Sequence, residues 1–403
     1  MRVCADSGSG TGNMKSEQPD TGSLPNPDAP LLPFRFVGSE RAWADCRRDL
    51  QAAPRLAIDL EANSMFAYSE RACLIQMSTA NHDYILDPLA DIDLSALGTI
   101  VADASVEKVF HAAEYDLILL RRDYDWHLNN LFDTMWAARI LGYQQIGLAS
   151  LLEQFYGVRL SKRYQKANWC HRPLSEAELA YAQKDTHYLL DLRDRLAAEL
   201  DQRGLMDEAQ EIFAEQSRVK MPNNGFDPEG FWTMNGVQDM NPQQQAALKA
   251  LYIFRDREAR RRNQPHFKVL GDRTLMEVAA ALPTRQSELS AVHGMTSGQQ
   301  QRYGRQVLDL IAEARQAPPP QAPKRAPRPP DAVLIRYDRL HRWRKTRAQA
   351  RGVESDVIIS RDALWAIAEA NPRTLEDLTT LNLLGPWRMA TYGEEIVRLL
   401  VKK

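Results

Sequence analysis

Cysteine is scarce in this sequence, and long apolar runs are absent. The 403 residues include four cysteines, Cys4, Cys46, Cys73 and Cys170, which form no C-x-x-C pair. Their wide spacing predicts neither a zinc site nor a disulfide framework, and it fits a reducing cytoplasm. No apolar run reaches the roughly 18 residues that a membrane helix needs. The sequence therefore argues against a disulfide-stapled secreted protein and against a membrane-spanning one.

The first residues also lack the pattern of a secretory signal. Residues 1–30 are rich in Gly, Ser, Pro, Asp and Asn, and they contain no hydrophobic stretch. This composition is typical of a disordered segment. We therefore predict a disordered leader over residues 1–32, with Met14 as an alternative start of the chain.

Neither sign of charge dominates the whole chain, but its two parts differ. The formal net charge is -2. Residues 1–240 hold 23 Lys and Arg against 36 Asp and Glu, whereas residues 241–403 hold 28 against 17. An acidic first part suits cation binding, and a basic second part suits a polyanion. Solvated helix surfaces of differing charge explain the same counts equally well.

The length and an internal repeat predict several domains. A soluble chain of 403 residues, 44% hydrophobic and 26% charged, suits two or three domains. An offset of 89 residues, without gaps, matches Arg255 with Arg344 and Tyr303 with Tyr392, and both copies have a helical pattern. The predicted divisions are a first domain at 33–217, a linker at 218–240, all-α domains at 241–315 and 331–403, and a proline-rich linker at 316–330.

The first domain has the pattern of a mixed α/β sheet. Strands are predicted at 55–62, 72–79, 83–86 and 108–111, and helices at 94–102 and from residues 115, 134, 148 and 176. Strands that come first, with helices interleaved later, indicate such a sheet. Ser175 and Glu178 form a capping-box pattern that fixes the start, and therefore the phase, of the last helix.

Two carboxylates share one face of the strand at 55–62. Because side chains alternate along a strand, Asp59 and Glu61 point to the same side, about 7 Å apart. Charges on an otherwise apolar strand are costly unless they are paired or bind a metal. Taken alone, the Asp-x-Glu pattern is better explained by a solvated strand end.

Two further segments carry acids that can reach the same place. Asp116 follows the strand at 108–111 at a helix start, where an acid commonly stabilises the first turn. Tyr181 and Asp185 lie four residues apart on the phased helix and share one face. A partly buried tyrosine beside a solvated aspartate is the ordinary explanation of that pair. Only the three segments together indicate a functional site.

In this order the three segments resemble the motifs of the DEDD exonucleases, in the subgroup whose third motif is Tyr-x-x-x-Asp. The segments LIQ at 74–76, FDT at 132–134 and WCHRPL at 169–174 extend the resemblance to ribonuclease D over residues 33–217, and the two tail repeats resemble HRDC domains. The resemblance implies an α/β, ribonuclease H-like exonuclease domain with a mixed sheet, followed by two small all-α HRDC-like domains.

The resemblance also implies a metal-dependent 3′→5′ exoribonuclease. The acids Asp59, Glu61, Asp116 and Asp185 offer hard oxygen ligands that suit Mg²⁺ or Mn²⁺. By the resemblance, two ions bind, with Asp59 shared, Glu61 and Asp185 on the nucleophile side and Asp116 on the other. Tyr181 is expected to orient the attacking water, because an ordinary tyrosine pKa of about 10 makes a poor base.

The expected substrate is the 3′ end of structured RNA such as a tRNA precursor, degraded to nucleoside 5′-monophosphates by a monomeric cytoplasmic protein. Two alternatives stay open. The first is a DNA-directed 3′→5′ exonuclease, which shares the motifs. It stays open because the 2′-hydroxyl contacts that distinguish RNA from DNA are not visible in these motifs. A non-catalytic RNA-binding scaffold can keep the fold, although the complete set of acids argues against it.

Several residues are candidate substrate contacts. The first motif ends in Ala62 where many relatives have phenylalanine, so Phe66 or Tyr68 is expected to stack on the terminal base instead. His111 and Gln76 are further candidates, with a structural role slightly favoured for His111. Asp133 is expected to cap its helix. The basic residues expected to contact phosphates, unless they form solvated faces for a protein partner, are Arg255, Arg257, Arg260, Arg261 and Arg262 in the first repeat and Arg342, Arg344, Lys345 and Arg347 in the second.

Overall fold

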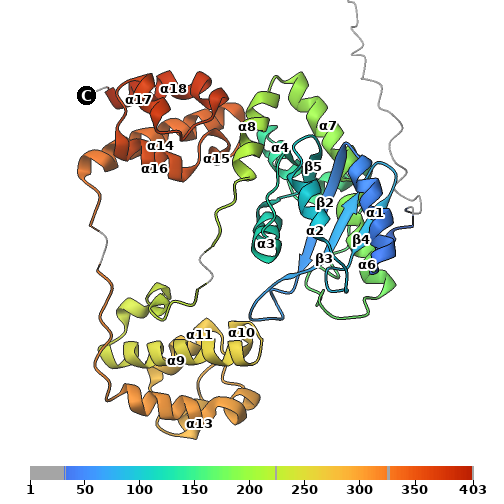
Figure 1. The fold of residues 1–403 in the computed structure, drawn as a ribbon. Coiled ribbons are helices and arrows are strands. Elements are labelled where there is room, and N and C mark those ends of the chain that lie inside the picture. Colours follow the sequence, from blue (N-terminus) through green and yellow to red (C-terminus); the bar gives the residue numbers. More distant parts are fainter. Residues whose placement is uncertain (1–30, 32, 223–224, 325–326, 402–403) are drawn as a thin grey trace, which may run out of the picture.

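The computed structural model describes residue 31 and residues 33–222, 225–324 and 327–401. Apart from residue 31, the leader predicted for residues 1–32 lies outside the described residues, and so does its predicted disorder. The described chain forms a sheet domain followed by two helical domains, as predicted (Figure 1). None of the helices in these ranges combines the length and the hydropathy that are needed to cross a membrane.

A six-stranded mixed sheet forms the centre of the first domain. Its order is β1-β4-β3-β2-β5-β6, and the consecutive strands β2, β3 and β4 pair antiparallel as the predicted meander. The other three strands pair parallel with their neighbours. The strands are β1 (Arg35–Val37), β2 (Arg55–Ala62), β3 (Ala72–Ser78), β4 (Asp83–Leu86), β5 (Glu107–Phe110) and β6 (Leu131–Asp133).

Helices cover both faces of the sheet, because the strands are apolar on both sides. Leu56, Ile58 and Leu60 pack with α1 (Glu40–Ala52), α2 (Ser95–Ala102) and α3 (Glu114–Tyr124). Ala57, on the opposite face, packs in a second cluster with α4 (Thr134–Ile140), α5 (Leu148–Tyr156), α7 (Leu189–Gln202) and α8 (Met206–Gln216). The helix α6 (Glu176–His187) packs through Ala182 in a smaller cluster with Leu74 and Ile85. Alternate residues along a strand therefore pack against different layers of helices.

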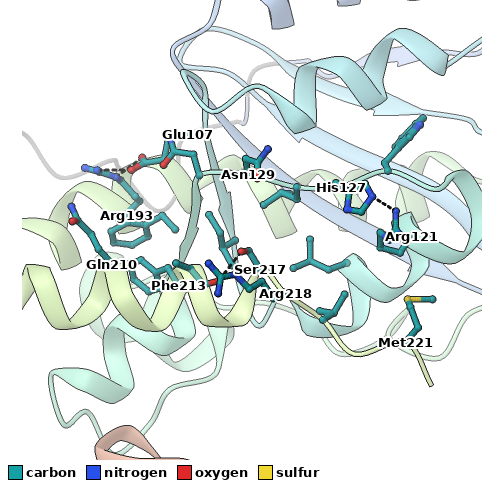
Figure 2. A pocket seen from close by; sticks show the side chains of 18 of the residues that line it. Glu107, Arg121, His127, Asn129, Arg193, Gln210, Phe213, Ser217, Arg218 and Met221 are labelled. Carbon is teal, nitrogen blue, oxygen red and sulfur yellow. Dashed lines mark hydrogen bonds and ion pairs between the residues drawn. The ribbon is translucent and has the colours of Figure 1, made fainter. Parts of the chain in front are cut away.

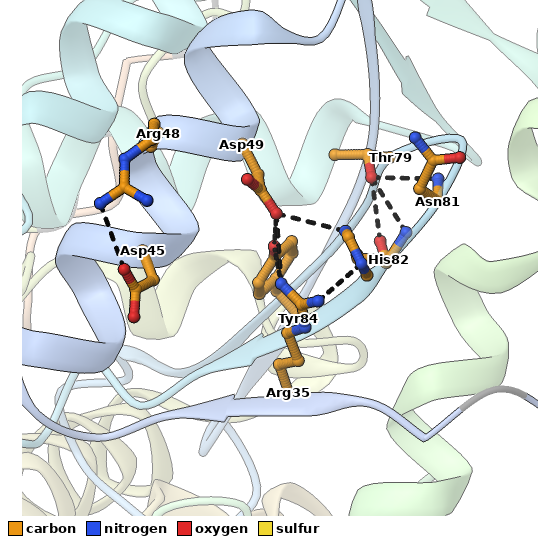
Figure 3. Close-up of polar contacts among 8 residues, drawn as sticks. All are labelled: Arg35, Asp45, Arg48, Asp49, Thr79, Asn81, His82 and Tyr84. Carbon is orange, nitrogen blue, oxygen red and sulfur yellow. Dashed lines mark hydrogen bonds and ion pairs between the residues drawn. The ribbon is translucent and has the colours of Figure 1, made fainter.

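Polar side chains attach β1 and α1 to the edge of the sheet (Figure 3). Arg35 on β1 donates to Asp49 on α1 at 3.2 Å and to the Tyr84 hydroxyl on β4 at 3.1 Å. Tyr84 also donates to Asp49, and this hydrogen bond is the main cause that lowers the pKa of Asp49. His82 lies 3.2 Å from the same carboxylate. Arg35, Asp49 and His82 are partly exposed, so each of their ion pairs contributes little and the cluster mainly fixes geometry.

The two helical domains repeat each other helix by helix. Each helix of the second starts 89 residues after its counterpart in the first, which confirms the predicted repeat. Arg262 donates to the Tyr303 hydroxyl at 3.0 Å, and the equivalent Arg351 donates to Tyr392 at 3.1 Å. The helices are α9 (Pro242–Arg261), α10 (His266–Val269), α11 (Asp272–Ala281), α12 (Gln286–Ser290) and α13 (Ser297–Ala314), then α14 (Asp331–Arg351), α15 (Ser355–Ile358), α16 (Arg361–Ala370), α17 (Leu375–Thr380) and α18 (Pro386–Val401).

The predicted linkers differ in character. The segment 218–240 contains two short 3-10 helices, η1 (Gly230–Thr233) and η2 (Val237–Asp239), and its Phe231, Trp232 and Val237 pack in the core of the first helical domain. The second half of this segment is therefore part of that domain. In the proline-rich segment, the described residues 318–324 and 327–330 have neither helix nor strand.

The second helical domain is attached to the sheet domain through buried charges (Figure 1). Arg351 makes a two-pronged contact with Glu208 of α8, at 2.6 and 2.7 Å, and the Glu208 side chain is 0% exposed. Glu211 of α8 accepts the backbone N–H groups of Trp387 and Arg388 and so caps α18. Such paired charges tolerate little rearrangement, because an unpaired buried charge is costly.

The first helical domain meets the loop between β2 and β3 instead. The Tyr68 hydroxyl donates to Asp256 of α9 at 2.6 Å, and the Tyr68 N–H donates to the Asn263 side chain at 3.1 Å. Lys268 lies 4.3 Å from the centre of the Phe66 ring. The loop that follows the Asp59 strand is thus in direct contact with the first repeat.

One sequence prediction is wrong: Cys73 and Cys170 form a disulfide, although no disulfide was expected. The two residues are 97 positions apart, but β3 and the segment before α6 lie side by side. Arg172 reinforces the contact by donating to the Cys73 carbonyl and to both Asp87 oxygens, at 2.6 to 2.7 Å. The spacing of the cysteines therefore gives no support for a reducing compartment.

We predict that Glu208→Ala lowers the stability of the chain by about 3–5 kcal/mol, because it leaves Arg351 in the interface without its partner. Differential scanning calorimetry measures the effect. The matched control is Glu394→Ala, which removes an exposed pair with Arg398 and should cost less than about 0.5 kcal/mol. Equal melting temperatures for the two variants would contradict the role of the interface.

Candidate metal centre

The strand β2 carries Asp59 and Glu61 on the face that α6 covers. The register pairs Asp59 with Gln76 and Glu61 with Leu74 on β3, and directly opposed residues share a face. Leu74 packs with Ala182 of α6 in the same apolar cluster. The two acids are therefore held at the boundary between the sheet and this helix, where they are partly buried.

The helix α6 brings Tyr181 and Asp185 to the two strand acids. Ser175 and Glu178 form the predicted capping box at its start, so the phase predicted from the sequence is confirmed. Ligand atoms of Asp59, Glu61 and Asp185 all lie within 4.8 Å of one another. Three of the four predicted acids thus form one group that can hold a metal ion.

A buried polar cluster, which the sequence analysis missed, fixes the rotation of α6. Asp83 on β4 accepts the Gln183 amide and the Ser78 hydroxyl, each at 2.6 Å, and lies 2.7 Å from His187 Nδ1. Burial raises the pKa of Asp83, but the hydrogen bonds from His187, Ser78 and Gln183 outweigh it and lower the pKa. Gln183 and His187 flank Asp185, so the cluster positions that carboxylate. The sequence contains one sign of this cluster, because Asp83 is an aspartate in a short and otherwise apolar strand.

Asp116 lies in the first turn of α3, directly after the turn that connects β5 to this helix. Ala112 in this turn has a left-handed backbone (φ 63°), which disfavours a residue with a side chain. The turn is held by Asp133, which accepts the N–H groups of Ala112 and Ala113 at 3.1 and 2.9 Å and also caps α4. The predicted capping role of Asp133 is confirmed, and a second role in positioning Asp116 is added.

The four acids raise one another's affinity for protons. Burial is the largest cause for each, and it raises the pKa of Asp59, Glu61, Asp116 and Asp185. The neighbouring acids add to the shift, since the charges of Asp59, Asp185 and Asp116 all raise the pKa of Glu61. Backbone hydrogen bonds from Leu60 act on both Asp59 and Asp116, which places Asp116 beside the other acids.

The donor chemistry of this group fits a hard divalent cation. The group consists of carboxylates, whose oxygens suit Mg²⁺ or Mn²⁺ better than zinc. A cation relieves the repulsion among the four acids, whereas their protonation is the alternative. The group of Asp59, Glu61 and Asp185 is therefore a candidate site for such an ion, with Asp116 close to it.

Tyr181 lies against aromatic side chains beside the acids. Its ring centre is 5.8 Å from that of Tyr164 and 5.9 Å from that of Trp169. Burial, followed by the charges of Asp185, Glu61 and Asp59, raises the pKa of Tyr181 above its ordinary value. The phenol therefore stays protonated at neutral pH, which suits a hydrogen-bonding role and not a general base.

The predicted substrate contacts in the first domain are mostly occupied by other partners. His111 lies 2.9 Å from the Thr134 hydroxyl, and burial lowers the pKa of His111 to about 4, so the structural role is supported. Gln76 is 0% exposed, which contradicts a direct contact with substrate. Tyr68 is hydrogen-bonded to Asp256, and Phe66 lies against Lys268, so both side chains contact the first helical domain, and their stacking on a base stays a prediction.

Arg255 and Arg344 are not the phosphate contacts that were predicted. They are only 6% and 8% exposed, and they make the same internal contact in the two repeats. Arg255 donates to the Leu270 carbonyl at 3.3 Å, and Arg344 donates to the equivalent Ile359 carbonyl at 3.0 Å. Their repetition across the two domains reflects packing. Arg257 and Lys345, by contrast, are exposed.

A cavity of about 710 Å³ lies on another side of the sheet domain (Figure 2). Its walls include Trp126, Phe132 and Phe213, and its Arg193 is paired with Glu107 at 2.7 Å. None of the four acids contributes to the lining of this cavity. The cavity is therefore separate from the candidate metal centre.

Family profiles match both parts of the chain. The family described as 3′-5′ exonuclease matches residues 34–201, and the HRDC domain matches residues 244–311 and 334–400. Members of the exonuclease family depend on divalent metal ions, which agrees with the acidic group. Both matches fall within the domains predicted from the sequence.

Known proteins resemble the chain over nearly its whole length. Ribonuclease D of Acidiphilium cryptum is 31% identical over 386 residues, which cover 93% of this chain and 94% of that protein. The crystal structure of Escherichia coli RNase D shares the fold, with a TM-score of 0.63 and 24% identity over 92% of this chain and 99% of that one. The catalytic core of RRP6 from Trypanosoma brucei has a TM-score of 0.63 and 26% identity, over 70% of this chain and 79% of that one.

We predict that Glu61→Gln stabilises the metal-free protein increasingly as the pH rises. The folded pKa of Glu61 lies above its unfolded value, so the wild type loses stability as the pH rises from about 4.5 through the folded pKa. The variant should match the wild type near pH 5 and exceed it near pH 9 by on the order of 1 kcal/mol. Urea unfolding in EDTA measures this difference.

The matched control is Glu176→Gln, an exposed substitution in the first turn of α6. It should change little at either pH. A Glu61→Gln variant whose stability relative to the wild type does not vary with pH would contradict the electrostatic account.

Proposed function

Because the chain belongs to the ribonuclease D family and is a 3′→5′ exoribonuclease, we propose that it trims the 3′ ends of structured RNA, such as tRNA precursors, and releases nucleoside 5′-monophosphates. The observation that carries the proposal is the group of Asp59, Glu61 and Asp185, with Asp116 and Tyr181 beside it. A related structure, that of the Escherichia coli enzyme, is described as an exoribonuclease involved in structured RNA processing, which supports this substrate class.

We propose that the acids hold two divalent ions, either Mg²⁺ or Mn²⁺. Asp59 would contribute to both ions, Glu61 and Asp185 would hold the one nearer the attacking water, and Asp116 would hold the other. Bound divalent ions supply positive charge that stabilises an in-line displacement at phosphorus. The closeness of the carboxylates and their raised pKa values support this assignment, because four acids of like charge need cations or protons between them.

Tyr181 is proposed to orient the attacking water. Its phenol stays protonated, so it can hold the water by a hydrogen bond but does not remove the proton. The rings of Tyr164 and Trp169 restrict its rotation, and the helix α6 keeps it four residues from Asp185. Such positioning lowers the barrier, because the water reaches the phosphorus already oriented.

The helical domains are proposed to hold the body of the RNA. The residues from 241 onward carry 28 Lys and Arg against 17 Asp and Glu, and exposed Arg257 and Lys345 remain available for phosphates. Such contacts give affinity without reading the sequence. Action as a monomer and a location in the cytoplasm stay predictions.

We predict that the chain shortens a 5′-labelled RNA hairpin with a single-stranded tail from its 3′ end when Mg²⁺ or Mn²⁺ is present. A matched DNA hairpin should be degraded at least about 10-fold more slowly, since RNA-specific enzymes contact the 2′-hydroxyl. Asp116→Ala should abolish the ladder, and the exposed Asp91→Ala should keep it. Gel electrophoresis follows the fragments, and chromatography identifies the released nucleotide.

Equal degradation of RNA and DNA would favour the DNA-directed alternative. Binding of RNA with no ladder under any ion would support the scaffold alternative and would contradict the proposed activity. Release of nucleosides or of nucleoside 3′-monophosphates would contradict the proposed bond cleavage.

We predict that Tyr181→Phe slows the single-turnover rate by about 100-fold, because the water loses its orienting hydrogen bond. Binding of Mn²⁺ and of RNA should stay within about twofold of the wild type. Tyr164→Phe is the matched control, because it removes a hydroxyl group from the neighbouring aromatic ring. A loss of metal affinity in Tyr181→Phe would contradict the orienting role.

A further inference from the structure

Gln76 lies directly beside the metal centre. It is opposite Asp59 in the antiparallel pairing of β2 with β3, so the two side chains share a face of the sheet. The helix α6, which carries Tyr181 and Asp185, packs over this face. Gln76 therefore occupies the floor of the site, one strand away from the carboxylate that is proposed to hold both ions.

The side-chain amide of Gln76 has no partner. It is 0% exposed, and neither its Oε1 nor its Nε2 makes a hydrogen bond to any described residue. The neighbouring polar group on the same strand and face is different, because the Ser78 hydroxyl lies 2.6 Å from Asp83 and 2.8 Å from Thr186. Gln76 is thus left out of the polar cluster that anchors α6.

An unpartnered amide at this position lowers stability. An amide that is buried without a hydrogen bond loses its bonds to water and gains none in return, which disfavours the folded state. The other side chains that face α6 from β3 and β4 include Leu74 and Ile85, which pack without such a cost. An apolar residue at position 76 would therefore stabilise the metal-free fold more. The stability of that fold does not explain why a glutamine is present.

The chemistry of the amide matches the neighbouring carboxylate. A primary amide has two N–H donors and one acceptor, and an ionised carboxylate accepts several hydrogen bonds. Asp59 lies directly opposite Gln76 in the register of β2 with β3, so its carboxylate oxygens are acceptors on the same face as the unpartnered amide. A metal-binding carboxylate that also accepts a hydrogen bond is held in one orientation.

We propose that Gln76 is a positioning residue of the metal centre: its side-chain amide donates to the Asp59 carboxylate when an ion is bound and so sets the orientation of that ligand. The inference rests on the metal-dependent function proposed above and adds a residue to it. Groups that hydrogen-bond to metal ligands in this way typically contribute about 10–100-fold to metal affinity or activity. Gln76 itself does not touch the substrate.

We predict that Gln76→Met, which keeps the length of the side chain and removes its amide, weakens Mn²⁺ binding by about 10–100-fold. The same variant should melt at a temperature equal to or higher than that of the wild type in EDTA, because it removes an unsatisfied amide. Electron paramagnetic resonance of free Mn²⁺ measures the affinity in the full chain, and scanning calorimetry measures the stability. Gln76→Leu provides a second apolar variant.

The matched control is Leu74→Met, a volume-conserving change on the same strand and face, opposite Glu61. It should leave Mn²⁺ affinity unchanged. A lower melting temperature with unchanged Mn²⁺ affinity in Gln76→Met would show a purely structural glutamine and would overturn the inference. Failure of both apolar variants to fold would overturn it too, because the amide would then have a partner in the metal-free fold.

The test separates this inference from the proposed function. A wild-type chain that takes up no Mn²⁺ overturns the metal-dependent function, and the inference fails with it. A wild-type chain that binds Mn²⁺ and degrades RNA, together with unchanged Mn²⁺ affinity in Gln76→Met, overturns the inference alone.

Discussion

The repulsion among Asp59, Glu61, Asp116 and Asp185 is the constraint on which the site depends. The strand register brings the first two acids together, the first turn of α3 adds the third, and α6 adds the fourth. Burial raises the pKa of all four, so the group keeps protons or takes up cations. The chemistry of the exonuclease family depends on the cations, because divalent ions held by carboxylates also neutralise the negative charge of the reacting phosphodiester.

The surrounding fold holds the acids against that repulsion. Asp83 fixes the rotation of α6 through Gln183 and His187, and Asp133 fixes the turn that leads into α3 and its Asp116. The Cys73–Cys170 disulfide and the Arg172–Asp87 pair clamp the segment before α6 to the sheet. Farther out, the second helical domain is attached through buried ion pairs, whereas the first contacts the β2–β3 loop through aromatic and polar groups. The positions of the acids on α6 and α3 are therefore set largely by contacts of neighbouring residues.

Local patterns predicted the main elements, and long-range pairings were not predictable. Side-chain alternation placed Asp59 and Glu61 on one face, the capping box gave the phase of α6, and the offset of 89 residues located both helical domains. The short strands β1 and β6 carry too few residues for a periodic signal. The disulfide depends on the meeting of segments 97 residues apart. Arg255 and Arg344 were predicted to be surface charges. A sequence does not show that each guanidinium is buried and donates to a backbone carbonyl.

Anomalous diffraction from crystals of the full chain soaked in Mn²⁺, with an RNA whose terminal phosphodiester resists cleavage, tests the central claim most directly. The account predicts two manganese peaks roughly 3.5–4 Å apart, with Asp59 in contact with both and Tyr181 facing the terminal phosphate. Manganese bound elsewhere, or a group of four carboxylates that stays protonated and empty at saturating Mn²⁺, would contradict it.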